Sequence, residues 1–242
     1  MVLFMKKAII IGASSGIGRE LAIVLSQNNY QVGLVSRREN LLIELQNELL
    51  GSSHIKTIDV ANTTQAMNQL KELIMEMNGV ELIIISAGCG FINPDLEYDK
   101  EQRTIDTNVS GFTAMMNVAY QYFLEKGQGH IVGISSVAAI RGGYDGPAYA
   151  ASKAFISNYM EGVRIKAKKA GVSLYITDIK AGLVDTAMAK GEGLFWVAPP
   201  EKAALQIYRA IESKKELTYV TKRWRLIAWL LKAMLNFVYQ KL

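Results

Sequence analysis

Short runs of apolar residues recur along the chain, separated by stretches in which apolar residues return every three or four positions. The runs have the length of strands, and the stretches between them have the periodicity of helices. The runs that we predict as strands are Lys7–Ile11, Val32–Ser36, His54–Ile58, Leu82–Ser86, His130–Ser135, Ser173–Ile179 and Glu216–Val220. Apolar strands alternating with helices predict an α/β fold, a doubly wound parallel sheet of about seven strands with helices on both faces.

The length of the chain suits a single domain built on this sheet. Its 242 residues, half of them hydrophobic, are enough to bury one sizeable core. The sequence shows no second domain, internal repeat or low-complexity segment. We therefore expect one α/β domain over residues 1–221 and a basic, amphipathic helical tail of the same domain over residues 222–242.

A glycine-rich turn, Gly12-Ala-Ser-Ser-Gly16-Ile-Gly18, follows the first predicted strand and leads into a helix that extends to about Gln27. Glycines permit a tight turn and a close approach of the backbone to a phosphate, and a helix N-terminus offers unpaired N–H groups. An ordinary strand–helix turn is the alternative. The placement between a strand and a helix favours dinucleotide binding in a Rossmann-like sheet.

The second predicted strand ends at Ser36 and is followed by Arg37 and Arg38. A carboxylate at this point would bind the ribose 2′-hydroxyl of NAD, whereas an arginine can accommodate the 2′-phosphate of NADP. A pair of solvated arginines at a helix start is the alternative, but cations are disfavoured at a helix N-terminus. The pair therefore favours NADP(H), with Arg37 as the residue that we expect at the phosphate.

Ser136, Tyr149 and Lys153 form the pattern with the most direct chemical meaning. Ser136 follows an apolar strand, so it lies at the carboxyl end of the sheet, where ligands bind in open α/β folds. Tyr149 and Lys153, at i and i+4 of a helix, share one face, and a nearby ammonium favours the phenolate of a tyrosine. Most Tyr-x-x-x-Lys pairs are ordinary surface neighbours, but this strand–loop–helix context suits proton transfer coupled to hydride transfer.

Together these motifs resemble those of the short-chain dehydrogenase/reductase family, NADP-type, from Lys7 to about Tyr219. The resemblance implies an oxidoreductase that moves hydride between NADP(H) and a carbonyl or alcohol. The residues at the family's catalytic positions are Asn108, Ser136, Tyr149 and Lys153. Those at its cofactor contacts are Gly12, Ser14, Ser15, Gly16, Ile17, Gly18, Arg37, Asp59, Val60, Ala87, Gly88, Asn108, Tyr149, Lys153, Gly182, Val184 and Thr186.

The resemblance also implies a role for each catalytic side chain. Tyr149 would act as general acid in reduction and general base in oxidation, and Ser136 would orient and polarise the substrate oxygen. Lys153 would lower the pKa of Tyr149 and bind the nicotinamide ribose. Asn108 would hold a water that links Lys153 to solvent.

The chain departs from the family pattern at Ile11, at Ile85-Ser86 and at Ala181, where threonine, a pair of asparagines and proline are usual. None of these changes removes a group that the chemistry needs. A second hypothesis is a cofactor-binding protein that docks to a membrane or a partner without significant turnover. The intact catalytic set argues against it.

The resemblance places two walls of a substrate site. One is the segment between Gly182 and Pro199, and the other is the loop Ala138–Ala148, with few charges in either. The residues that we expect in the first wall are Met188, Gly191, Gly193, Leu194, Phe195 and Trp196, and those in the second are Ile140, Tyr144 and Pro147. We expect a fairly apolar carbonyl or alcohol substrate; packing of these residues against each other or a partner subunit is the alternative. The resemblance further implies a homodimer or homotetramer through the helices Asn108–Leu124 and Tyr149–Ala170.

The tail from Lys222 to Leu242 has five cations and no acidic residue, so it accounts for the whole net charge of +5. Apolar residues fall at helical spacing on one face: Ile227, Leu230, Leu231, Met234, Leu235 and Val238. Charges interrupt any run long enough to span a bilayer. Two interpretations of this tail remain open. It could be a helix that lies in a membrane interface, with peripheral contact, or a helix that packs on the protein or a second subunit. The apolar face argues against nucleic acid.

Few other residues suggest chemistry. Cys89 is the only cysteine, so no intramolecular disulfide can form, which suits a reducing compartment. Cys89 follows Gly88 and is interpreted as a small apolar filler near the cofactor. The only histidines, His54 and His130, are too isolated to suggest a metal site. Met1–Met5 is too short for a signal peptide, so we expect a cytoplasmic protein.

Overall fold

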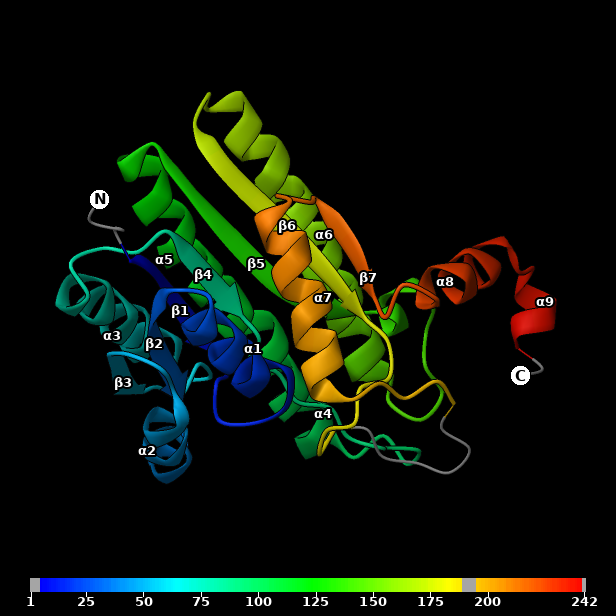
Figure 1. The fold of residues 1–242 in the computed structure, drawn as a ribbon. Coiled ribbons are helices and arrows are strands. Elements are labelled where there is room, and N and C mark those ends of the chain that lie inside the picture. The colour runs from blue at the N-terminus through cyan, green and yellow to red at the C-terminus, as the bar shows by residue number, and fades with distance from the viewer. Residues whose placement is uncertain (1–4, 189–194, 241–242) are drawn as a thin grey trace.

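The computed structural model describes residues 5–188 and 195–240, and these residues fold around one parallel sheet (Figure 1). Its strands lie in the order β3-β2-β1-β4-β5-β6-β7, and every pairing is parallel. They are β1 (Lys6–Ile11), β2 (Tyr30–Ser36), β3 (Ser53–Thr57), β4 (Leu82–Ile85), β5 (Gln128–Ser136), β6 (Ser173–Ala181) and β7 (Leu217–Val220). The predicted doubly wound sheet is confirmed, and each strand end lies within two residues of its predicted position.

Helices cover both faces of the sheet (Figure 1). One face carries α1 (Gly16–Gln27), α2 (Glu39–Glu48) and α7 (Pro200–Glu212), and the other carries α3 (Thr63–Glu76), α5 (Phe112–Lys126) and α6 (Pro147–Lys169). Shorter elements connect these or end the chain: α4 (Tyr98–Ile105), the π-helix η1 (Asp106–Gly111), the 3-10 turn η2 (Val137–Ile140), α8 (Trp224–Ala233) and α9 (Asn236–Tyr239).

Strand side chains alternate between two cores. In β1, Ile9 and Ile11 pack with residues of α3, α5 and α6, whereas Ala8 and Ile10 pack with residues of α1, α2 and α7. All four side chains are fully buried. Because both faces of the sheet are covered, the strands appear in the sequence as continuous apolar runs.

A buried polar network interrupts the core beside the carboxyl ends of β5 and β6. Asp178 and Lys180 of β6 form an ion pair with an Oδ2–Nζ distance of 3.3 Å, and both side chains are buried. Ser135 of β5 and Ser157 of α6 donate hydrogen bonds to the Asp178 carboxylate, and Lys180 donates to Ser157. These bonds tie two strands and a helix together near the carboxyl edge of the sheet.

The tail differs from the single helix that the spacing predicts. Its backbone is extended at Met234 and Leu235, which ends α8 and starts the short α9 in a new direction. The turn allows the Tyr239 hydroxyl to donate a hydrogen bond to the Gly142 carbonyl over 2.5 Å. The residues predicted on one face are consequently divided: Ile227, Leu231 and Met234 are partly buried, and Leu230, Leu235 and Val238 are exposed. Within residues 5–188 and 195–240, no helix is long and apolar enough to cross a bilayer.

Replacing Asp178 with alanine should destabilise the fold through a single uncompensated charge. The change leaves the Lys180 ammonium buried without a carboxylate, and breaking one side of a buried pair costs about 3–5 kcal/mol. We expect the free energy of unfolding, measured by denaturant titration, to fall by about that amount. The double variant Asp178→Ala/Lys180→Met should recover much of the loss; equal losses in the single and double variants would contradict this account.

Candidate active site

The four predicted catalytic residues come from three elements that meet at the carboxyl edge of the sheet. Ser136 ends β5, Tyr149 and Lys153 lie in the first two turns of α6, and Asn108 lies in η1. The Ser136 hydroxyl accepts a hydrogen bond from the Ala138 N–H over 3.1 Å and donates one to the Ala181 carbonyl over 3.2 Å. Ser136 lies close enough to Tyr149 for its hydroxyl to influence the pKa of the phenol.

Lys153 is buried beside the ring of Tyr149. Its Nζ lies 5.6 Å from the centre of that ring and donates a hydrogen bond to the Ile134 carbonyl over 2.9 Å. Burial lowers the pKa of Lys153 to about 8, against the opposing effects of the Cys89 thiol and the Asp178 carboxylate. The ammonium is therefore positioned beneath the phenol, but it holds its proton less firmly than an exposed lysine does.

Tyr149 is a protonated phenol at neutral pH in this environment. Burial raises its pKa, and the nearby Ser136 hydroxyl opposes that effect only in part. Lys153 is not among the groups that lower this pKa, and burial raises it because desolvation penalises the phenolate. The backbone of Gly90 contributes to this burial: a Cβ at that position would lie 2.6 Å from Cδ2 of Tyr149.

Asn108 is fully buried, and its amide fixes the turn that follows β4. Its Nδ2 donates to the Cys89 carbonyl over 2.7 Å and to Ser152 Oγ over 2.9 Å, and its Oδ1 accepts from the Cys89 N–H over 2.9 Å. Gly88 lies between Asn108 and Lys153. The wider π-helical turn, a feature often found at functional sites, was not evident from the sequence. The water that Asn108 is expected to hold stays a prediction.

The glycine-rich turn is compressed between the end of β1 and the start of α1. Gly12 has a φ of +96°, and a Cβ there would lie 2.5 Å from the Ala87 nitrogen. A Cβ at Gly18 would lie 2.1 Å from the Gly12 carbonyl oxygen, and one at Gly16 would lie 2.9 Å from the methyl group of Thr186. The turn after β1, the turn after β4 and the loop after β6 therefore meet. The predicted cofactor residues on these segments, which are far apart along the chain, thus lie close together.

Arg38, and not its neighbour Arg37, contacts this turn. One guanidinium nitrogen of Arg38 donates to Ser14 Oγ over 2.8 Å and to Ser15 Oγ over 2.7 Å. Arg37, the residue that we expected at the phosphate, is exposed, and no side-chain hydrogen bond of it occurs among the described residues. The sequence did not distinguish the two residues, because two adjacent arginines at a strand end carry the same local signal.

The remaining predicted cofactor residues lie around the same edge. Asp59 is exposed and accepts a hydrogen bond from the Ala61 N–H, and Val60 is buried against Gly111 of η1. Ile17 is partly buried in α1, and Val184 is buried and bridged to Ala198. Gly182 lies directly beneath the indole of Trp224.

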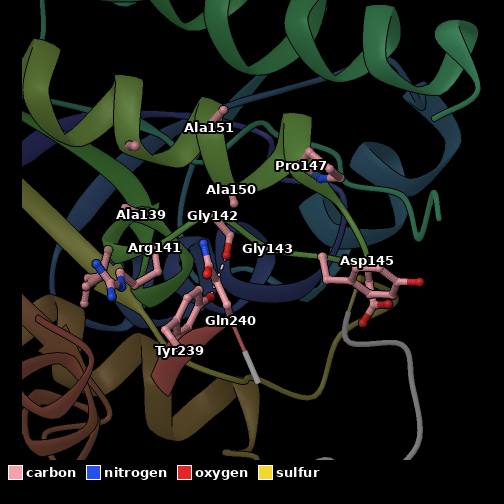
Figure 2. A pocket seen from close by; sticks show the side chains of 13 residues that line it. Ala139, Arg141, Gly142, Gly143, Asp145, Pro147, Ala150, Ala151, Tyr239 and Gln240 are labelled. Carbon is pink, nitrogen blue, oxygen red and sulfur yellow. Dashed lines mark hydrogen bonds between the residues drawn. The ribbon is translucent and has the colours of Figure 1, made fainter. Parts of the chain in front are cut away.

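A cavity of about 960 Å³ lies between the loop that follows β5 and the tail, and none of the four predicted catalytic residues lines it (Figure 2). One side is the predicted wall loop, including Ile140, Tyr144 and Pro147, and another is the outer surface of α6. Tyr239 and Gln240 of the tail complete it, a contribution that sequence reasoning did not foresee. In the first wall, Phe195 and Trp196 pack against Trp224, with ring centres 5.3 and 6.3 Å away, and Met188 is exposed. The predicted wall residues Gly191, Gly193 and Leu194 lie outside the described residues.

A family model described as short chain dehydrogenase matches residues 6–194. The chain belongs to the short-chain dehydrogenase/reductase family. An uncharacterized oxidoreductase of Myxococcus xanthus is 33% identical over 184 residues, which are 74% of this chain and 72% of the relative. An uncharacterized oxidoreductase of Staphylococcus epidermidis is 30% identical over 188 residues, which are 77% of this chain and 81% of the relative.

Solved structures share the short-chain dehydrogenase fold with this chain. An alcohol dehydrogenase from the archaeon Thermococcus sibiricus, complexed with 5-hydroxy-NADP, has a TM-score of 0.79 at 20% identity and covers 89% of this chain and 95% of its own. ElxO with NADP bound has a TM-score of 0.77 at 19% identity, covering 89% and 97%. At these identities the likeness shows the shared fold.

The charge of Lys153 should be titratable near neutral pH. As the pH rises through about 8, the lysine loses its proton and the positive charge beneath Tyr149 disappears. We expect one lysine signal in ¹³C-lysine NMR spectra to titrate there and to be absent from the Lys153→Met variant. If the signal lost in that variant titrates instead at the ordinary lysine value of about 10.4, the described burial is wrong.

Proposed function

We propose that the protein is an NADP(H)-dependent oxidoreductase that transfers hydride between the nicotinamide and an apolar carbonyl or alcohol. The burial of Lys153 beside the Tyr149 ring, at the strand end where Ser136 lies, is the observation that carries this proposal. Family membership supplies the reaction class, and these three side chains supply groups for its proton transfer. Ile140, Tyr144 and the alanines of the cavity favour an apolar substrate, and Arg141 and Asp145 are the charged residues that line it.

The residues around the glycine-rich turn fit the cofactor. The close approach of Gly12 and Gly18 leaves the N-terminus of α1 open to a pyrophosphate, because neither carries a side chain. Arg38 supplies a fixed guanidinium beside the turn, which suits a 2′-phosphate. The NADP derivative in the Thermococcus sibiricus enzyme and the NADP in ElxO support the same choice here.

When bound, NADPH supplies the hydride for the carbonyl carbon. Ser136 holds the carbonyl oxygen by a hydrogen bond, and Tyr149 gives its phenolic proton to that oxygen, so that an alcohol and a phenolate result. The phenolate is stabilised by the Lys153 ammonium, and it regains a proton from solvent, with Asn108 holding a water on that route. The raised pKa of Tyr149 favours the proton donor form and hence the direction of reduction.

Self-association and location complete the proposal. Most of the large apolar side chains of α5 and α6 are buried in the core: Met115, Met116, Tyr120, Phe123 and Ile156. Phe155 and Tyr159 remain partly exposed and stack with ring centres 5.4 Å apart, so they are the residues that a homodimer or homotetramer would cover. A cytoplasmic location suits NADPH-dependent reduction and a single free cysteine. The proposed peripheral membrane contact would lie on the tail.

Replacing Tyr149 with phenylalanine should separate cofactor binding from turnover. Loss of the proton donor should slow NADPH oxidation with aldehydes, ketones, keto-lipids or steroids about 100-fold or more, while NADPH binding by fluorescence titration stays close to that of the wild type. Turnover that survives the change would reject Tyr149 as the acid. Binding without wild-type turnover across the whole panel would favour a cofactor-binding role instead.

Replacing Arg38 with alanine should weaken binding of NADPH far more than binding of NADH. Charge-assisted hydrogen bonds contribute about 1.5–3 kcal/mol, so the Kd for NADPH should rise roughly 10- to 100-fold. Arg37→Ala is the matched control, because it removes a neighbouring arginine with no hydrogen bond to the turn. A large loss in Arg37→Ala with little change in Arg38→Ala would restore the assignment made from the sequence.

A further inference from the structure

Helix α8 carries apolar side chains on two opposite faces, and only one of them packs on the protein. The inner face lies against η2 and β7, where Trp224 and Ala228 are buried. The outer face comprises Leu226, Trp229, Leu230 and Ala233, which follow the i, i+3, i+4, i+7 spacing of a helix surface. Leu226 and Trp229 are 63% and 65% exposed. A helix that met only water on this side would carry polar residues there.

The exposed apolar surface continues past the turn into α9. Leu235 and Phe237 are 63% and 62% exposed, and Val238 is also exposed. These side chains, together with the outer face of α8, form what we call the tail surface: Leu226, Trp229, Leu230, Ala233, Leu235, Phe237 and Val238. Both helices project beyond the β7 edge of the sheet (Figure 1). Groups of exposed apolar residues on consecutive helices are a mark of interaction sites.

The segment that carries the tail surface also carries cations and has no acidic residue in its sequence. Lys222, Arg223, Arg225 and Lys232 are exposed, and within the described part of the chain none of them forms an ion pair. The tail's five cations leave 22 basic residues elsewhere, which the 22 acidic residues balance. The excess positive charge of the molecule is therefore concentrated beside its exposed apolar surface.

We propose that the tail surface docks on an anionic lipid bilayer, with the leucines, Trp229 and Phe237 in the interface and the cations on the headgroups. A second copy of the chain fits less well. A two-fold contact between tails would set cations against cations, with no carboxylate in the tail to meet them. An anionic lipid surface matches both the charge and the apolar side chains.

The inner face of the tail connects this surface to both walls of the substrate site. Near its start, Trp224 packs on Gly182 and on the rings of Phe195 and Trp196. Near its end, Arg141 donates to the Met234 carbonyl over 2.9 Å and lies 4.8 Å from the Tyr239 ring centre. Figure 2 shows Tyr239 and Gln240 at the cavity, on the side opposite Pro147. Docking would set this cavity beside the bilayer, so that, given the proposed function, the substrate class would include carbonyl compounds dissolved in the membrane.

Co-flotation of the full chain with vesicles tests the docking directly. We expect the protein to float with vesicles of phosphatidylcholine mixed with phosphatidylglycerol, to float less at high salt, and to stay at the bottom with phosphatidylcholine alone. Leu226→Ser/Trp229→Ser should weaken vesicle binding at least tenfold, because it removes two exposed apolar side chains from the interface. Arg225→Gln/Lys232→Gln should reduce binding to the anionic vesicles.

Leu50→Ser/Met75→Ser is the matched control, since these side chains are 64% and 68% exposed on distant parts of the protein. It should bind vesicles as the wild type does. Circular dichroism and NADPH binding should be unchanged in every variant, which separates loss of docking from loss of folding. Turnover of a water-soluble aldehyde by the same variants separates loss of docking from failure of the proposed reaction.

Three results would overturn the proposal. The first is no flotation with either kind of vesicle, and the second is flotation that Leu226→Ser/Trp229→Ser does not change. The third is a lipid-free dimer, measured by light scattering, that the same variant dissociates, because this would assign the tail surface to a second copy of the chain.

Discussion

An ammonium group taken out of water loses a large solvation free energy. For Lys153, this loss is offset only by interactions with neighbouring groups, which the fold must hold in position. The Ile134 carbonyl accepts its hydrogen bond, and the Asp178 carboxylate opposes the lowering of its pKa. Asp178 is in turn fixed by Ser135 and Ser157, so β5, β6 and α6 must pack correctly before the charge can sit beneath Tyr149. The same packing places Ser136, at the end of β5, near the phenol of Tyr149.

Most of this arrangement could be predicted from local patterns in the sequence. Runs such as Lys7–Ile11 are apolar throughout because both faces of the sheet are covered, and their ends fix which residues reach the carboxyl edge. The helix period places Tyr149 and Lys153 on one face without further information. Ser136, Tyr149 and Lys153 could therefore be assigned before any coordinates, and the structure brings them together.

The features that escaped prediction depend on contacts between distant segments or on a single backbone angle. Arg37 and Arg38 give one signal, and the course of the chain between β2 and α2 decides which guanidinium meets Ser14. The contact of Gly90 with Tyr149 and the resulting rise in pKa arise from a loop that follows another strand. The tail was expected to offer one apolar face, but it offers two, because its inner contacts with Gly182 and Gly142 use one side and leave the other exposed.

The value of kcat/KM for NADPH, measured across neutral and alkaline pH with a saturating aldehyde, tests the central claim most directly, because it reports ionisations of the protein before the cofactor binds. The buried charge beneath Tyr149 predicts a value that falls as the pH rises through about 8, where Lys153 loses its proton. A value that stays constant well above that pH, in an enzyme that Lys153→Met inactivates, would contradict the account.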